Sequence, residues 1–162
     1  GSTTRLISGQ SFQNLCKEVR HSLNDKNEKV VGNGIRTIGH LLSLSCYYEP
    51  SLEMENCHRN IYQTLTEKIK LANDDAIATS STLSWKQRSF TKKHARGAAT
   101  SLSVLLNSPI PWTDLCYMEN ALTQLIMCIK NSETLDGKIT LAASSTLKAT
   151  PGAIWQKCKK SV

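Results

Sequence analysis

Apolar residues recur along the chain at the spacing of one face of an α-helix. In residues 28–42, "EKVVGNGIRTIGHLL", the residues Val31, Ile35, Ile38 and Leu42 follow one another by four, three and four positions. This spacing predicts a helix, whereas a half-buried strand would alternate with a period of two. Three further stretches keep the helical spacing: Phe12, Leu15, Cys16, Val19 and Leu23; Cys57, Ile61, Leu65 and Ile69; and Leu115, Met118, Leu122, Leu125 and Ile129. The pattern predicts an all-α fold.

Three glycines interrupt residues 28–42 and raise the alternative of a glycine-rich phosphate-binding loop. Gly32, Gly34 and Gly39 lie inside the helical pattern, where each costs a helix about 1 kcal/mol relative to Ala. A dinucleotide-binding loop requires a preceding strand and a following βαβ unit, and the pattern around this segment contains neither. We therefore interpret the segment as a helix in which a small residue is needed where a second helix approaches closely.

The segment that begins at Lys29 has two relatives in the same chain. It aligns with a segment beginning at Lys93, 64 positions later, and with one beginning at Lys138, a further 45 positions on. The three segments share a basic first residue, a small residue five positions later and an aliphatic residue nine positions later: Lys29, Lys93 and Lys138; Gly34, Ala98 and Ala143; Ile38, Leu102 and Leu147. Because another amphipathic stretch precedes each segment, the repeat predicts three helical hairpins.

Turn residues and prolines divide these hairpins. Residues 24–27 and 131–137 are polar and predict the turns inside the first and third hairpins, and prolines at 50, 109 and 111 mark the joints. The 19 additional residues in the second hairpin fit a basic, Ser/Thr-rich insertion loop at about 73–91. We divide the chain into a tag remnant (1–2), repeat 1 (3–48), repeat 2 with its insertion (49–108), and repeat 3 with a C-terminal extension (109–162). Pro151-Gly152 ends the third hairpin, and a short helix follows.

Paired helices at this repeat length are similar to HEAT repeats of the armadillo-like class. The segments "EKVVGNGIRTIGHLLSL", "KKHARGAATSLSVLLNSPIPWTDLCYMENALTQLIMCIKN" and "KITLAASSTLKATPG" resemble the C-terminal repeats of the HEAT repeat-containing protein 6 family. Residues 93–97 depart from that family, which has K-V-R-W-N there. The resemblance implies an α-solenoid of about three HEAT-type hairpins, a fragment of a right-handed superhelix. It implies a scaffold, with the second helix of each hairpin on the concave surface, and supplies no catalytic residue.

The net charge of +7 is unevenly distributed. No acidic residue lies between Ala76 and Thr113, and a second acid-free run follows Asp136. On the concave surface that the resemblance implies, the second helices would carry a ladder of partner-binding cations: Lys29, Arg36, Lys93, Arg96 and Lys138. Such a ladder would attract an acidic peptide, a phosphorylated segment or a nucleic-acid backbone. The alternative is a solvated ridge in which the lysines pair locally with acids such as Glu28 and Asp136.

Two tryptophans have different expected roles. Trp85 lies in the expected insertion beside Lys86 and Arg88, where an aromatic ring among cations could anchor a partner or stack on a base. The alternative is that the loop docks onto its own repeat. Trp112 follows Pro111, and we expect it to pack between repeats.

Features of an enzyme, a metalloprotein or a membrane protein are missing from the pattern. Six cysteines are scattered without a CxxC pair, which favours buried, reduced thiols in the cytoplasm or nucleus. Cys57 and His58 are adjacent, so helical geometry turns their side chains about 100° apart, which is unsuitable for a shared metal. We expect no catalytic residue, no metal and no cofactor, and no stretch is long and apolar enough to span a membrane.

Two functional hypotheses follow. The first is a non-enzymatic scaffold that binds a protein partner, as yet unidentified, through the second helices. The second is a basic surface that contacts nucleic acid or another polyanion. Because a repeat buries its apolar face only against its neighbours, a fragment is also expected to self-associate through exposed repeat ends.

Overall fold

The computed structural model describes residues 9–44, 51–80, 82–107 and 116–158, and all the regular structure in these ranges is helical. The expectation of an all-α fold is confirmed. Asn27 and Asp136 cap two of the helices by accepting hydrogen bonds from backbone N–H groups two residues later, at 2.9 Å each. The helices are α1 (Gly9–Ser22), α2 (Glu28–Ser43), α3 (Leu52–Ile77), α4 (Trp85–Leu106), α5 (Cys116–Lys130), α6 (Gly137–Ala149) and α7 (Gly152–Cys158).

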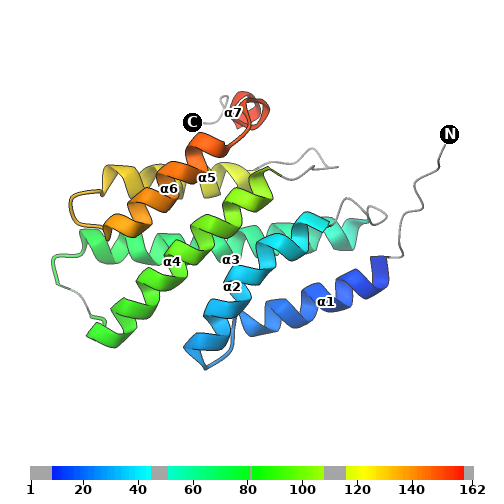
Figure 1. The fold of residues 1–162 in the computed structure, drawn as a ribbon, viewed down its shortest axis with the longest axis horizontal. Coiled ribbons are helices and arrows are strands. Elements are labelled where there is room, and N and C mark those ends of the chain that lie inside the picture. The colour runs from blue at the N-terminus through cyan, green and yellow to red at the C-terminus, as the bar shows by residue number, and fades with distance from the viewer. Residues whose placement is uncertain (1–8, 45–50, 81, 108–115, 159–162) are drawn as a thin grey trace.

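The first six helices form two layers (Figure 1). Helices α1, α3 and α5 make one layer, and α2, α4 and α6 lie across it as the second layer. Each second-layer helix packs against its hairpin partner, α4 also packs against both α2 and α6, and α7 contacts α5. The core lies between the layers, where Ile35, Leu65 and Leu102 are fully buried. The turns expected at 24–27 and 131–137 lie between the helices of their hairpins, and the prolines at 50, 109 and 111 lie outside the described residues.

The insertion loop expected at 73–91 is largely helical instead. Helix α3 continues to Ile77 and α4 begins at Trp85, so the additional residues lengthen both helices of the second hairpin. The buried Asn73 holds the end of α3, because its amide donates to the backbone oxygen of Gln124 at 3.1 Å and accepts from Asn131 at 3.2 Å. At the start of α4, Ser84 and Gln87 form a reciprocal capping box. Because polar contacts hold the end of α3 and the start of α4, these residues lack the apolar spacing from which a helix is predicted.

Gly34 and Gly39 of α2 lie at close helix contacts, as the helix interpretation requires, whereas Gly32 does not. Gly34 packs against Ser22 and Leu23 of the α1 hairpin partner, and a Cβ at Gly34 would lie 3.2 Å from Leu23 Cδ2. Gly39 faces α4, where a Cβ would lie 2.8 Å from the carbonyl oxygen of Ser101. The contact of α2 with α4 was not indicated by the sequence pattern, since the repeat comparison singled out only the Gly34 position.

The packing between second-layer helices repeats with the offsets found in the sequence. The buried Ser101 hydroxyl donates to the carbonyl oxygen of Ile35, which joins α4 to α2. The buried Thr146 hydroxyl is shared between the carbonyl oxygen of Ala99 of α4, at 2.9 Å, and that of Ala142 in its own helix, at 2.8 Å, so it also joins α6 to α4. The two donors are 45 positions apart and the two acceptors are 64 positions apart. The alignment of the three segments is therefore also the register in which α4 and α6 pack.

Candidate functional site

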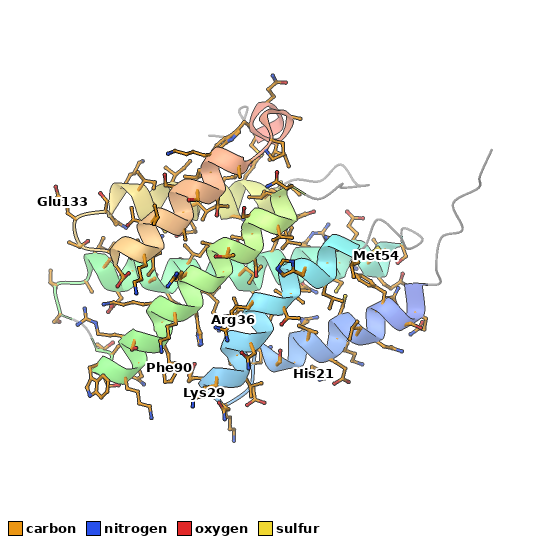
Figure 2. All side chains as sticks on the ribbon, viewed as in Figure 1. His21, Lys29, Arg36, Met54, Phe90 and Glu133 are labelled. Atoms are coloured by element: carbon orange, nitrogen blue, oxygen red, sulfur yellow. The ribbon has the colours of Figure 1, made fainter. Side chains whose placement is uncertain are left out.

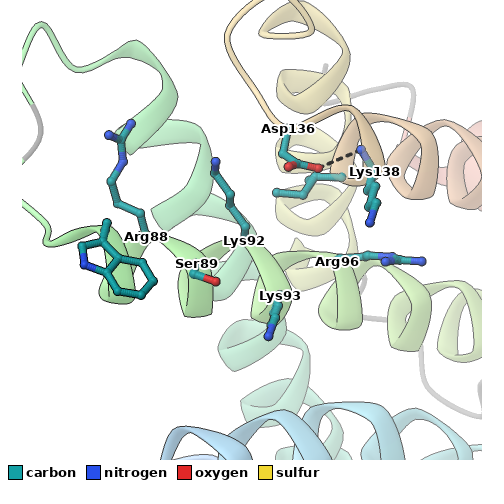
Figure 3. A pocket seen from close by; sticks show the side chains of 9 residues that line it. Arg88, Ser89, Lys92, Lys93, Arg96, Asp136 and Lys138 are labelled. Atoms are coloured by element: carbon teal, nitrogen blue, oxygen red, sulfur yellow. Dashed lines mark hydrogen bonds between the residues drawn. The ribbon is translucent and has the colours of Figure 1, made fainter.

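Two adjoining grooves run between the second-layer helices near their N-terminal ends. The α4–α6 groove has a volume of about 520 Å³ and is lined by cationic side chains from both helices (Figure 3). These cations are Arg88, Lys92, Lys93, Arg96 and Lys138. Asp136, the N-cap of α6, is the acidic side chain among its lining residues.

The α2–α4 groove is larger, with a volume of about 760 Å³. Lys29 and Arg36 line it from α2, and Figure 2 shows them with Phe90 of α4 along the space between the two helices. Lys93 and Arg96 line this groove as well as the α4–α6 groove, so the two grooves share one wall. We call the walls of these two grooves the basic face. All five residues of the sequence-predicted ladder lie on it.

Most cations of the α4–α6 groove have no carboxylate partner. Among the residues that the structure describes, Lys92, Lys93, Arg96 and Lys138 form no ion pair, whereas Arg88 Nε lies 3.1 Å from Asp75 Oδ2. The Asp75 side chain is 13% exposed, so this pair ties the start of α4 to the end of α3.

The alternative that the lysines pair locally with Glu28 and Asp136 is wrong for these two acids. The Asp136 carboxylate accepts a hydrogen bond from the backbone N–H of Lys138 at 2.9 Å and makes no ion pair with its ammonium group. The Glu28 carboxylate lies 3.6 Å from His94 Nε2 instead of pairing with Lys29. Neither acid therefore forms an ion pair with the neighbouring lysine, and both lysines remain available to a ligand.

The arrangement of these cations is unfavourable for helix α4 in isolation. Arg88, Lys92 and Arg96 follow one another by four positions, which places like charges on one helix face and opposes the helix by about 0.2–0.5 kcal/mol per pair. The first turn of α4 has no acidic residue, although the helix dipole favours negative charge there. The positive charges on this face of α4 therefore do not stabilise the helix itself.

Uncharged and aromatic groups line the α2–α4 groove between its cations. His94 Nε2 lies 3.2 Å from the carbonyl oxygen of Glu28, and burial lowers the pKa of His94 below its ordinary value, so the imidazole is neutral at pH 7. The Lys93 ammonium lies 5.9 Å from the centre of the Phe90 ring, within the range of a cation–π contact.

The sequence had suggested that Trp85 lies in a loop, but Trp85 is the first residue of α4. It lines the α4–α6 groove beside Arg88 and is 83% exposed, so it does not dock onto its own repeat. Lys86, the third member of the expected anchor, lines neither groove. Lys92 was not assigned to the site from sequence, although its spacing of four from Arg88 and from Arg96 was a signal for it.

The cysteines and histidines form no second site in the described part of the chain. Cys16, Cys128 and Cys158 are buried free thiols, while Cys57 is half-buried and Cys116 is exposed. Across the described ranges, no three Cys, His, Asp or Glu residues are grouped as metal ligands would be. None of the helices described is both long and apolar enough to cross a lipid bilayer. Cys46 and Trp112 lie outside the described residues.

Comparisons with protein-family models, with curated proteins and with solved structures yield no match to this chain. The resemblance to HEAT repeats therefore remains a prediction from sequence. Conclusions about function depend on the basic face itself.

Proposed function

We propose that this chain is part of a HEAT-type α-solenoid and acts as a non-enzymatic scaffold that binds an acidic segment of a protein partner on the basic face. The observation that carries the proposal is the convergence of cations from three helices on two adjoining grooves, with Lys93 and Arg96 common to both. The repeated hydroxyl–carbonyl bonds from Ser101 and Thr146 support the solenoid, because each second-layer helix meets the preceding one in the same way.

The grooves combine charge at their rims with apolar side chains beneath. Ile35 lines the α2–α4 groove and Ile139 lines the α4–α6 groove, and both are almost fully buried. An extended peptide can place its carboxylates against the cations, and its aliphatic carbons lose contact with water as it enters the groove. Charge complementarity gives orientation and a fast association rate, and burial of the apolar carbons adds affinity.

Charge reversal at the shared wall tests this function. A fluorescently labelled peptide of alternating Glu and Ala residues is titrated with the protein at low and at physiological salt. We expect Lys93→Glu/Arg96→Glu to weaken binding by at least about tenfold. The matched control, Lys17→Glu/Lys130→Glu, makes the same change in net charge at exposed positions of the first layer. Equal weakening by both variants would show that total charge, and not the basic face, determines binding.

A specific observation favours nucleic acid as a second candidate partner. Trp85 exposes 83% of its surface beside a cationic groove, and an exposed indole can stack on an unpaired base. A single-stranded oligonucleotide that binds through this feature would lose affinity steeply with salt and again on Trp85→Ala substitution.

A further inference from the structure

The α4–α6 groove differs from its neighbour in the balance of its charges. It is the smaller groove, yet five cations line it, against four in the α2–α4 groove. With Arg88 paired to Asp75, four cations remain without a carboxylate partner in the described structure, the same number as in the larger α2–α4 groove, so the α4–α6 groove holds them in a smaller volume. We propose that the α4–α6 groove binds a phosphoryl group, and that the acidic partner segment carries a phosphoserine or phosphothreonine at this point. This inference rests on the proposed function.

The charge of a phosphoryl group suits this groove better than that of a carboxylate. An extended peptide presents side chains on one face at every second residue, about 7 Å apart. A groove of about 520 Å³ thus receives one or two of them. A glutamate contributes one negative charge, whereas a phosphorylated serine contributes about 1.5 to 2 negative charges and three acceptor oxygens. One phosphoryl group could therefore neutralise about two of the four unpaired cations.

The hydrogen-bonding state of the two arginines points in the same direction. In the described structure the guanidinium group of Arg96 donates to no acceptor, so its donors are available for the paired bonds that phosphate accepts. Figure 3 shows Arg96 extending from α4 beneath Lys138 of α6, so that the two helices present their cations to the same space. The guanidinium group of Arg36, in the α2–α4 groove, already donates to Asn33. The α4–α6 groove is thus the better prepared of the two for a phosphoryl group.

The limited extent of the basic face favours a phosphorylated peptide over a nucleic-acid strand. The repeat position of Arg36 is occupied by Thr100 in α4 and by Ser145 in α6, so the cations do not continue along these helices. Three adjacent helices at about 8–10 Å spacing span only about 20 Å. That length covers about six phosphates of one duplex strand, the low end of the roughly 6–10 contacts of backbone recognition. It matches about six residues of an extended peptide.

Three peptides that differ at one position test the inference. Each has about ten residues of alternating Glu and Ala, with phosphoserine, glutamate or serine at the centre, and binding is measured by fluorescence anisotropy. We expect the phosphoserine peptide to bind at least about tenfold more tightly than the glutamate peptide. Lys138→Gln should reduce this preference, because Lys138 lines only the α4–α6 groove. The matched variant Lys29→Gln, in the other groove, should weaken both peptides by the same factor.

The outcomes separate this inference from the proposed function. If the phosphoserine and glutamate peptides bind equally and both respond to Lys93→Glu/Arg96→Glu, the phosphoryl site is wrong and the acidic-segment function stands. If no peptide binds even at low salt, both are wrong. If an oligonucleotide binds far more tightly than any peptide and Trp85→Ala abolishes that binding, nucleic acid replaces the phosphorylated segment as the ligand.

Discussion

Replacing Gly39 by alanine should destabilise the protein, although alanine is the better helix former. Gly39 is buried where α2 crosses α4, and a Cβ there would lie 2.8 Å from the Ser101 carbonyl oxygen and 2.9 Å from Ser101 Cα. Both atoms belong to the backbone, so the clash is relieved only by moving one helix away from the other. That movement would also strain the hydrogen bond from Ser101 to Ile35.

The expected magnitude follows from two opposing effects. Overpacking a tight contact costs about 1–3 kcal/mol, and a clash with backbone belongs at the upper end of that range. Removing a glycine from a helix interior returns about 1 kcal/mol. We therefore expect Gly39→Ala to lower the free energy of unfolding by about 2 kcal/mol, which corresponds to a midpoint about 1 M lower in urea.

Gly32 of the same helix provides the matched control. A Cβ at Gly32 would lie 3.9 Å from the His94 ring, which is ordinary van der Waals contact, so only the helix-propensity gain applies. Gly32→Ala should therefore raise the free energy of unfolding by about 0.5–1 kcal/mol. Urea unfolding followed by circular dichroism measures both variants. A Gly39→Ala protein as stable as Gly32→Ala would refute the close α2–α4 contact.

Two further predictions concern buried polar groups. Thr146→Val removes the hydroxyl that is shared between the Ala99 carbonyl at 2.9 Å and the Ala142 carbonyl at 2.8 Å and should cost about 1 kcal/mol in urea unfolding. Thr37→Val, at the equivalent but exposed position of α2, should stay within about 0.5 kcal/mol of the parent, and equal costs would argue against the repeated bond. Burial lowers the pKa of His58 from 6.5 to about 4, so the unfolded chain binds a proton more readily. His58 therefore contributes stability that is complete above pH 6.5, is lost as the pH falls towards 4, and amounts to about 3 kcal/mol. The loss between these pH values should be smaller in His58→Gln, and an unchanged pH profile would show that His58 is not responsible.

Many of the helices could be predicted because each depends on the spacing of apolar residues a few positions apart. The apolar spacing around Ile35, Ile61 and Leu122 identified the helices on which these residues lie, since a helix presents one face every 3.6 residues. The pattern erred at Leu15, which has the spacing of the buried face but is 50% exposed. The spacing shows which residues share one face of a helix, but it does not show how much of that face the neighbouring helix covers.

The cations that line the two grooves, except Lys92, were named from the sequence, but their arrangement in space was not. Lys93 was chosen because its position recurs as a lysine in the repeat, and Arg96 because it follows on the same expected helix in an acid-free run. That they form the common wall of two grooves depends on the side-by-side packing of α2, α4 and α6. Whether a lysine pairs with a nearby acid also depends on what else that acid contacts, as Asp136 shows by capping its helix.

The sequence by itself determined that the chain is helical, where most helices lie, and the register in which its segments repeat, because these depend on residues a few positions apart or on the chain's similarity to itself. The tertiary structure decided how far α3 and α4 extend, since Asn73 is fixed by Gln124 and Asn131, more than fifty positions away. It also decided which cations remain unpaired, because ion pairs such as Arg88 with Asp75 form between helices. Contacts between separate elements have no local period, and they become visible only when the elements are packed.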